Sequence, residues 1–404
     1  MADGSRPAEA FKPPYMPAVR VPTQQGPFGL RFDFNEGCRV HTPDDGEKWR
    51  VCLTDLDTGN VLFETSADFG AGLMRSAKRY FIRFRIETWR GGELVFTHEY
   101  DARGRDVLVQ LYPHTVGDGI GWFPNAARFQ DRHGCRLTCA MGEKLIPLFR
   151  DVYPHIELVP HDAVDTSRFY ASYIVGVFFD KLGQSLQPTD FRVVGLHRHA
   201  AYILGLEPDE MPPRIAIADD GRPIAEPYVC IATQSTGQSK YWNNPNGWPE
   251  IVSYLKGVGY RVICIDQQPA NGQGPVWNHI PPGAEDETGD RPLQERARWL
   301  KHADFFIGLS SGLSWLAWAA GTPVVMISGF THPINEFNTP YRIINYHVCN
   351  SCWNDTQLAF DGGDFMRCPR HKGTTRQFEC TAAITTDHVK AVLQRIPSFG
   401  RINR

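Results

Sequence analysis

A strand–helix–strand unit in the C-terminal half of the chain is the feature that most constrains the fold. The segment "FFIGLSSGLSWLAWAAGTPVVMIS" (305–328) places two short, continuously apolar runs on either side of a helical pattern. Continuously apolar runs are typical of strands buried on both faces, as in a parallel sheet covered by helices. The expected helix stops at Gly321 and Pro323, two residues that favour termination. The unit therefore predicts an α/β domain with a parallel sheet.

The same alternation of apolar runs and helical patterns occurs in two separate blocks. The first contains "DVLVQL", the loop "YPHTVGDGIG" and the helix "WFPNAARFQDRHG", which ends at Gly134. The second contains "YVCIATQ", the helix "WPEIVSYLKGVG", "RVICID" and the unit described above. Two such doubly wound domains facing one another place ligands in the cleft between them.

A β-rich region precedes both blocks. "YFIRFRIETWR" alternates apolar and polar side chains, which is typical of a half-buried antiparallel strand. Six prolines before residue 28 predict an extended arm and not a folded element. The expected domains are the proline-rich arm at 1–28, the β-rich domain at 29–103, the first α/β domain at 104–225 and the second at 226–404, which includes a cysteine-rich segment at 346–381.

Charge and hydropathy argue against several classes of protein. The formal net charge of −3 and the isoelectric point near 6.5 provide no basic surface for nucleic acid or for an acidic membrane. No segment approaches the roughly 20 consecutive apolar residues of a membrane-spanning helix, and the N-terminus has no apolar run of signal-peptide length. We therefore expect a cytoplasmic protein without a membrane span and without a nucleic-acid partner.

The turn before the helix of the 305–328 unit is a candidate phosphate site. Ser310, Ser311 and Gly312 lie between a buried strand and the helix, and Leu313 is the first apolar residue after them. Free backbone N–H groups at a helix N-terminus, together with the helix dipole, bind phosphate; a turn capped by serine is the alternative.

The turn is not a P-loop, because no Lys-Ser/Thr pair follows the glycine. "GDGIG" is not the dinucleotide fingerprint either, because its third glycine comes one residue early, so a nicotinamide or flavin dehydrogenase is disfavoured.

Two charged residues follow strands of the second α/β domain. Lys240 is the only cation of the polar loop "TQSTGQSKYWNNPNGWP", where its charge can neutralise a diphosphate leaving group; a solvated loop lysine is the alternative. Asp266 ends "RVICID", where a carboxylate can bind the hydroxyl pair of a ribose. The alternative role for Asp266 is to cap a turn.

Asp118 is the candidate base in the first α/β domain. It lies in the expected loop after the first strand of that domain, on the cleft side. A carboxylate at this place can take the proton of an incoming hydroxyl, a contribution typically worth roughly 10²–10⁴-fold in rate. The alternative is a cap at the N-terminus of the following helix.

Four of the ten cysteines form a set of their own in a short, loop-rich segment. Their pattern is Cys349-x2-Cys352-x15-Cys368-x11-Cys380. A disulfide framework is disfavoured in a cytoplasmic chain. Four thiolates suit tetrahedral zinc or a single iron ion, and a closed shell of four sulfurs is structural and not catalytic. Spacing alone makes zinc the default metal.

Several segments together resemble a known family. "LQERARWLKHADFFIGLSSGLSWLAWAAGTPVVMISG" is similar to the nucleotide-binding signature of the lipopolysaccharide heptosyltransferases. "TVGDGIGWFPNAARF", "TQSTGQSKYWNNPNGWPE", "SGFTHPINEF", "CNSCWND" and "CPRHKGTTRQFECT" more closely resemble the bacterial autotransporter heptosyltransferases, and the resemblance runs over about residues 32–392. It implies an α/β fold of the GT-B glycosyltransferase type with an added N-terminal β-domain. It also implies inverting transfer of heptose from ADP-D-glycero-β-D-manno-heptose to serine hydroxyls of autotransporter adhesin repeats.

The resemblance also implies roles for individual residues. Asp118 is the general base, Lys240 holds the diphosphate, and the turn of Ser310, Ser311 and Gly312 with Leu313 beside it binds phosphate. The four cysteines hold a structural iron ion in place of zinc, and the members form large homo-oligomeric rings such as dodecamers. No catalytic metal is required when a lysine and a helix terminus neutralise the leaving group.

The sequence departs from the family pattern at two positions and leaves two other functions open. The lipopolysaccharide enzymes usually have aspartate and histidine where this chain has Ser310 and Trp315, so those contacts do not transfer. Trp315 is interpreted as a packing residue. One alternative function is a transferase that uses another nucleotide sugar or a glycan acceptor. The other is a non-catalytic scaffold built around the metal segment.

Overall fold

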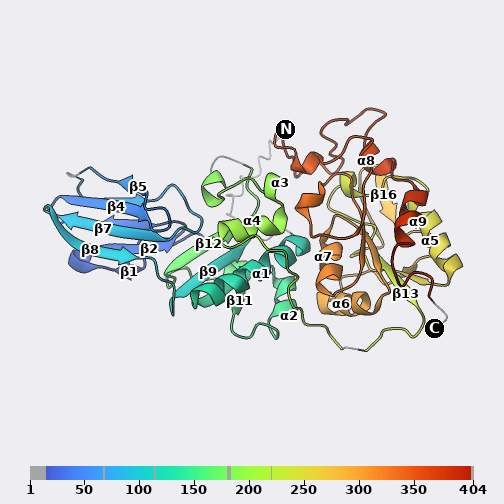
Figure 1. The fold of residues 1–404 in the computed structure, drawn as a ribbon, viewed down its shortest axis with the longest axis horizontal. Coiled ribbons are helices and arrows are strands. Elements are labelled where there is room, and N and C mark those ends of the chain that lie inside the picture. Colours follow the sequence, from blue (N-terminus) through green and yellow to red (C-terminus); the bar gives the residue numbers. More distant parts are fainter. Residues whose placement is uncertain (1–14, 67–68, 113–114, 180–182, 220, 402–404) are drawn as a thin grey trace, which may run out of the picture.

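The computed structural model describes residues 15–66, 69–112, 115–179, 183–219 and 221–401. Three bodies lie in a row along the long axis of the molecule: a β-rich part, a first α/β part and a second α/β part, coloured blue, green and yellow to red (Figure 1). Residues 1–14 of the expected arm lie outside the described residues. No helix in the described ranges is both long enough and apolar enough to cross a bilayer.

The β-rich part contains a four-stranded antiparallel sheet in the order β5–β4–β7–β8. In β7 the side chains of Phe84, Ile86 and Thr88 are buried and their neighbours are partly exposed, which confirms the expected half-buried strand. The strand starts at Phe84 and not at the beginning of the alternating segment. The bounds are β4 (Trp49–Asp55), β5 (Val61–Glu64), β7 (Phe84–Arg90) and β8 (Glu93–Glu99).

A second sheet joins the β-rich part to the first α/β part. Its order is β11–β10–β9–β12–β2–β3–β6, and β1 pairs with the first two residues of β2. Strands β9 to β12 and β2 are parallel neighbours, whereas β3 and β6 continue the sheet in antiparallel pairing. The sheet therefore crosses the expected boundary between the two domains. The bounds are β1 (Gln24–Gln25), β2 (Arg31–Asn35), β3 (Arg39–Thr42), β6 (Gly72–Arg75), β9 (Asp106–Leu111), β10 (Arg136–Met141), β11 (Glu157–Pro160) and β12 (Ala171–Val175).

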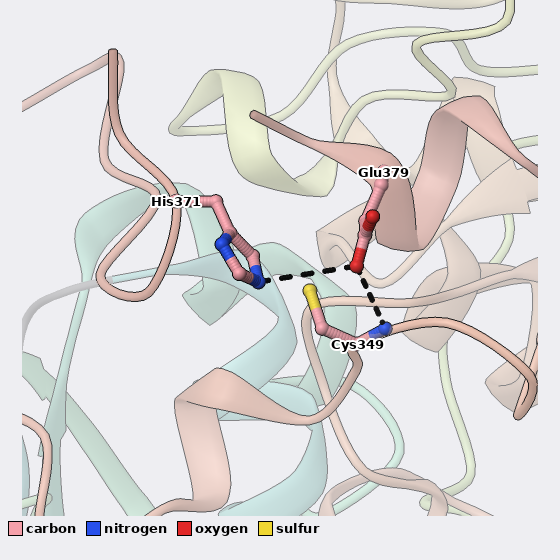
Figure 2. Close-up of side chains that lie close together, drawn as sticks. All are labelled: Cys349, His371 and Glu379. Carbon is pink, nitrogen blue, oxygen red and sulfur yellow. Dashed lines mark hydrogen bonds and ion pairs between the residues drawn. The ribbon is translucent and has the colours of Figure 1, made fainter. Parts of the chain in front are cut away.

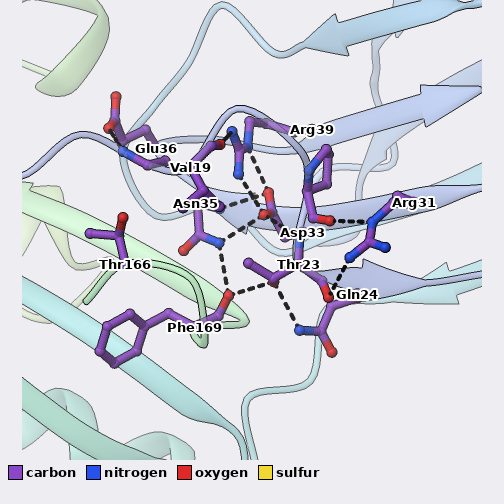
Figure 3. A network of polar contacts seen from close by, with 12 residues as sticks. Val19, Thr23, Gln24, Arg31, Asp33, Asn35, Glu36, Arg39, Thr166 and Phe169 are labelled. Atoms are coloured by element: carbon purple, nitrogen blue, oxygen red, sulfur yellow. Dashed lines mark hydrogen bonds and ion pairs between the residues drawn. The ribbon is translucent and has the colours of Figure 1, made fainter.

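A buried ion pair fixes the junction between β2 and β3 (Figure 3). The guanidinium of Arg39 donates to both carboxylate oxygens of Asp33, and neither side chain is exposed to solvent. The N-terminal segment is tied to the same pair, because Arg39 donates to the carbonyl of Val19 at 2.6 Å and the N–H of Thr23 donates to Asp33 at 3.0 Å. Residues 19–25 are thus held against the sheet, and two of them form strand β1.

Helix α1 (Val116–His133) follows β9 and differs from the expectation. We expected a helix from Trp122 with Asp118 in a preceding loop, and this was wrong. Thr115 caps the helix by accepting a hydrogen bond from the N–H of Asp118, which is the third helical residue. Glycines and the internal Pro124 oppose a helix by local propensity, so the start was misplaced. The helix ends at Gly134 in the left-handed region, as expected.

The second α/β part is a six-stranded parallel sheet in the order β17–β14–β13–β18–β19–β20. The expected strand–helix–strand unit is present as β18, α7 and β19, and α7 packs on both strands. A separate antiparallel hairpin, β15–β16, follows β14. The strand bounds are β13 (Tyr228–Ile231), β14 (Arg261–Cys264), β15 (Ala270–Gln273), β16 (Val276–His279), β17 (Glu285–Asp286), β18 (Phe306–Leu309), β19 (Val324–Ile327) and β20 (Tyr341–Ile343).

The remaining helices cover the two sheets and meet between them. Helix α1 of the first part packs against α7 of the second, and α2 packs against α6. The bounds are α2 (Ile146–Phe149), α3 (Phe191–Val194), α4 (Leu196–Ile203), α5 (Gly247–Val258), α6 (Leu293–His302), α7 (Gly312–Ala319), α8 (Glu379–Ala382) and α9 (Thr386–Leu393).

Candidate functional site

The N-termini of α1 and α7 meet where the two α/β parts face each other. A side-chain carbon added to Gly312 would lie 3.0 Å from Cβ of Val116 and 3.2 Å from the backbone nitrogen of Gly117. This approach brings the first turn of one helix against the first turn of the other. The structure therefore places Asp118, on α1, and the serine turn, before α7, at the same place between the two domains.

Asp118 is partly buried where the two domains meet. Burial raises the pKa of its carboxyl group to about 6, although the Thr115 hydroxyl and the charge of Lys240 act in the opposite direction. A carboxylate whose pKa lies just below neutrality is ionised at pH 7 and is still a much stronger base than an exposed aspartate. This is the behaviour that a general base needs.

Lys240 reaches the same neighbourhood from the second domain. It ends the short 3-10 helix η5 (Gln238–Lys240), whose first N–H donates to the carbonyl of Phe365 at 2.8 Å. Burial lowers the pKa of Lys240, whereas the negative charges of Asp118 and Glu336 raise it. The structure thus brings together Asp118 and Lys240, which come from different domains.

The serine turn is built partly as expected. Ser311 is the N-cap of α7, and its side chain does not cap the helix, so the first N–H groups of α7, from Gly312 and Leu313, lack a side-chain cap. The Ser310 hydroxyl is buried and is bound within the protein, because it donates to the carboxylate of Glu336 and lies 2.9 Å from Oγ1 of Thr331. The turn therefore offers backbone N–H groups and not the Ser310 hydroxyl.

Asp266 is buried inside the second domain. Its buried carboxylate accepts hydrogen bonds from the N–H and hydroxyl of Thr233, at 2.7 and 2.9 Å, and from the N–H of Gln234 at 3.2 Å. Burial raises the pKa of Asp266, and these donors lower it. This geometry favours the alternative role, the capping of the turn that begins the Lys240 loop, and a contact to ribose remains a prediction.

The four cysteines of the predicted metal site are free thiols that converge in one segment. Burial raises the pKa of Cys380, and the thiols of Cys349, Cys352 and Cys368 raise it further, so all four lie within electrostatic reach. Ser351 has a left-handed backbone that folds the chain between the first two cysteines.

A histidine and a glutamate lie beside Cys349 (Figure 2). The ligand atoms of Cys349, His371 and Glu379 all lie within 4.8 Å of one another, so these residues are a second possible ligand set. Arg376 pairs with Glu379 and lowers the pKa of its carboxyl group to about 2, and the N–H of Cys349 donates to it at 3.1 Å. Neither His371 nor Glu379 belongs to the four-cysteine set that the sequence predicts.

The cysteine segment is packed against the loop that follows β19. The N–H of Ser351 donates to the carbonyl of Gly329 at 2.8 Å, and the N–H of Trp353 donates to that of Phe330 at 3.0 Å. A side-chain carbon on Gly329 would lie 2.4 Å from the carbonyl oxygen of Cys380, so only glycine fits there. The same loop continues to Glu336, which contacts the serine turn.

Three side chains near Lys240 were missed by reasoning from the sequence. Glu336 and Arg367 act on the pKa of Lys240, and the indole of Trp353 lies 5.5 Å from Nζ. Nothing in the sequence around Glu336 or Arg367 indicates that these residues lie near Lys240. Trp353 directly follows Cys352, and its position beside a predicted metal ligand could have marked it as a candidate.

Two α/β domains, with a helix N-terminus, a lysine and a carboxylate where they meet, define a glycosyltransferase of the GT-B class. Two family models match the chain: "Glycosyltransferase TibC, N-terminal domain" over residues 26–92 and "Glycosyltransferase family 9 (heptosyltransferase)" over residues 197–358.

Several relatives match nearly the whole chain. The autotransporter heptosyltransferases BAHTCr of Citrobacter rodentium and TibC of Escherichia coli O78:H11 are each 52% identical over 93% of this chain and over 91% and 92% of their own lengths. BimC of Burkholderia thailandensis, described as an inactive autotransporter heptosyltransferase, is 46% identical over 97% of this chain and 91% of its own. The chain therefore belongs to the autotransporter heptosyltransferase family.

Crystal structures of one relative share the fold. The iron-containing dodecameric glycosyltransferase TibC from enterotoxigenic E. coli superposes with a TM-score of 0.90 at 50% identity, covering 94% of this chain and 99% of the other. The same enzyme in complex with ADP-D-beta-D-heptose gives a TM-score of 0.89 with the same identity and coverage.

Proposed function

We propose that this protein transfers heptose, with inversion, from ADP-D-glycero-β-D-manno-heptose to serine hydroxyls of autotransporter adhesin repeats. The observation that carries the proposal is the meeting of Asp118 and Lys240 beside the N-terminus of α7. A base on one side of a cleft and a cation with free N–H groups on the other are the parts that such a transfer needs. The relative crystallised with ADP-heptose supports this donor.

The reaction follows from these positions. The Asp118 carboxylate takes the proton of the serine hydroxyl, and the serine oxygen forms a bond to the anomeric carbon of the heptose. The bond from that carbon to the diphosphate oxygen breaks on the opposite face, and ADP leaves with the electron pair. Lys240 and the N–H groups of Gly312 and Leu313 stabilise the charge that develops on the diphosphate.

We assign a structural iron ion to the four cysteines. Thiols without disulfide partners, three of them buried, suit a metal shell. The N–H of Phe378 donates to Sγ of Cys368 at 3.5 Å, a contact that stabilises a thiolate. Glu379 is a weaker candidate ligand, because Arg376 and the N–H of Cys349 already bind its carboxylate. The iron-containing relative supports iron over zinc. The ion would hold the segment in its folded form.

The remaining assignments follow the same relatives. A large ring of identical subunits is supported by the dodecameric relative. The cytoplasmic location and the adhesin acceptor remain predictions. A non-catalytic scaffold is the second candidate function, because one relative of 46% identity is described as inactive.

Co-expression with an adhesin passenger tests the proposal. Intact-mass measurement and peptide mapping are expected to find added heptose on serine residues when the host makes ADP-heptose. A host that cannot make ADP-heptose is the matched control and should yield unmodified passenger. An unmodified passenger in the first host, from protein that still binds ADP, would favour the scaffold. Another sugar mass, or modification of a glycan only, would favour the other transferase.

A further inference from the structure

The indole ring of Trp353 lies against the ammonium group of Lys240. Nζ is 5.5 Å from the centroid of the ring, within the range over which a cation is attracted to an aromatic face. In the described ranges, no ion pair or side-chain hydrogen bond holds this ammonium group. The aromatic face is therefore the direct side-chain contact that positions the Lys240 charge.

Trp353 is itself held in a defined orientation. Its indole N–H donates to Oδ1 of Asn335 at 3.1 Å, and its backbone N–H donates to the carbonyl of Phe330. Four aromatic rings surround the indole, with centroids 4.7–6.4 Å away: Phe179, Phe191, Phe330 and Phe360. A half-buried ring with this many fixed neighbours provides a rigid surface for the lysine.

The same short segment contacts both α/β parts. Trp353 lies in the 3-10 helix η7 (Cys352–Asn354), directly after a predicted metal ligand. The side chain of Asn354 donates to the carbonyl of Arg192 in the first α/β part at 2.9 Å, and its Oδ1 accepts from the N–H of His332 in the second at 3.0 Å. The position of the indole is thus set by the cysteine segment and by both domains.

We propose that Trp353 is a positioning residue for Lys240, through which the cysteine segment influences diphosphate binding where the two α/β domains meet. This inference rests on the proposed function, because it assumes that Lys240 binds the diphosphate. It gives the cysteine segment an effect on binding of the nucleotide sugar. The folded segment presents the indole face, and that face holds the ammonium group where the nucleotide diphosphate binds.

A double-mutant cycle on ADP affinity tests the inference. Trp353→Leu should weaken ADP binding, measured by calorimetry, by roughly 3- to 30-fold, the range expected when an aromatic face is withdrawn from a cation. Trp353→Phe keeps an aromatic face and should stay within about threefold of the parent. In a Lys240→Met background, Trp353→Leu should cause no further loss. The KM for the nucleotide sugar should rise in Trp353→Leu, whereas the KM for the acceptor should not.

Phe360→Leu is the control for a loss of packing around the indole. Phe360 touches the indole of Trp353, with centroids 4.7 Å apart, and is not the ring beneath Lys240. This variant should lose less ADP affinity than Trp353→Leu, because the aromatic face beside Lys240 remains, and elemental analysis should find the same metal content in all variants. An unchanged affinity in Trp353→Leu, an equal loss in Phe360→Leu, or a loss that persists without Lys240 would overturn the inference. Unchanged ADP binding in Lys240→Met alone would instead overturn the proposed role of Lys240.

Discussion

Gly117 lies directly against the indole of Trp315, and the two residues come from different domains. A side-chain carbon on Gly117 would lie 2.7 Å from Cδ1 of Trp315, and one on Gly121, a turn later, would lie 3.0 Å from Cζ3 of the same ring. Trp315 is buried, as its interpretation as a packing residue requires. Because no Cβ intervenes, α1 and α7 approach closely enough to bring Asp118 beside the N-terminus of α7.

Gly117→Ala is expected to lower the stability of the protein and the rate of transfer. The added methyl group forces the helices apart, and overpacking of this kind typically costs about 1–3 kcal/mol. Thermal unfolding and transfer assays measure the two effects. Gly257→Ala in α5 is the matched control: no atom lies within 4 Å of its added carbon, and a gain of roughly 0.5–1 kcal/mol is expected there. Equal melting of the parent and Gly117→Ala would contradict the close contact.

Asp118→Asn is expected to lower the rate of transfer by roughly 10²–10⁴-fold while ADP binding is retained. The amide keeps the shape of the side chain and loses the basic oxygen. Single-turnover transfer and calorimetry with ADP measure the two effects. Asp131→Asn, an exposed position on the same helix, should behave like the parent. Transfer at the parental rate by Asp118→Asn would exclude this residue as the base.

The rate of transfer is expected to depend on pH through Asp118. Only the ionised carboxylate accepts a proton, so kcat/KM should rise as the pH rises through about 6 and level off above it. The measurement is a pH–rate profile with stability verified at each pH. A profile without an inflection between pH 5 and 7, with chemistry rate-limiting, would contradict this assignment.

The same carboxyl group predicts a stability change of a defined sign. The pKa of Asp118 is raised from 3.8 to about 6 in the folded state, so the folded protein binds more protons than the unfolded chain between these values. The contribution of Asp118 to stability is therefore lost as the pH rises through this window. Asp118→Asn should raise the free energy of unfolding at pH 7 by at most about 3 kcal/mol, and the melting temperature should rise with it. This gain should vanish near pH 4. A gain that is larger at pH 4 than at pH 7 would show the opposite sign.

Substitutions in the cysteine segment distinguish its two possible ligand sets. Cys352→Ser should lose the metal and lower the melting temperature, because Cys352 belongs to the four-cysteine set only. His371→Ala should keep the metal, because His371 belongs only to the set with Glu379. Elemental analysis and the visible absorption spectrum measure the metal, with Cys135→Ser, a buried cysteine of the first α/β part, as the control. Metal lost in His371→Ala and kept in Cys352→Ser would favour the set with His371 and Glu379.

Periodicity and apolar runs predicted most of the secondary structure, because strands and helices that bury apolar faces leave regular patterns in the sequence. The start of α1 was wrong for a physical reason. Its glycines and Pro124 oppose a helix locally, and the gain that compensates them is contact with Trp315 in another domain. The pairing of β2 with β12 was missed for a similar reason. The charged Asp33 argues against a buried strand when the sequence is read alone, and in the structure Arg39 neutralises that charge.

The sequence by itself determined the two α/β domains, the cysteine set and, through resemblance to a family, the kind of reaction. Those conclusions depend on residues near one another in the chain, where spacing carries information. Only the tertiary structure decided that the Ser310 hydroxyl is bound by Glu336, that Asp266 caps a turn, and that Trp353 contacts Lys240. Each of these depends on which side chains meet after the chain folds, and hydrogen bonds and ring contacts between distant segments leave no pattern in the sequence.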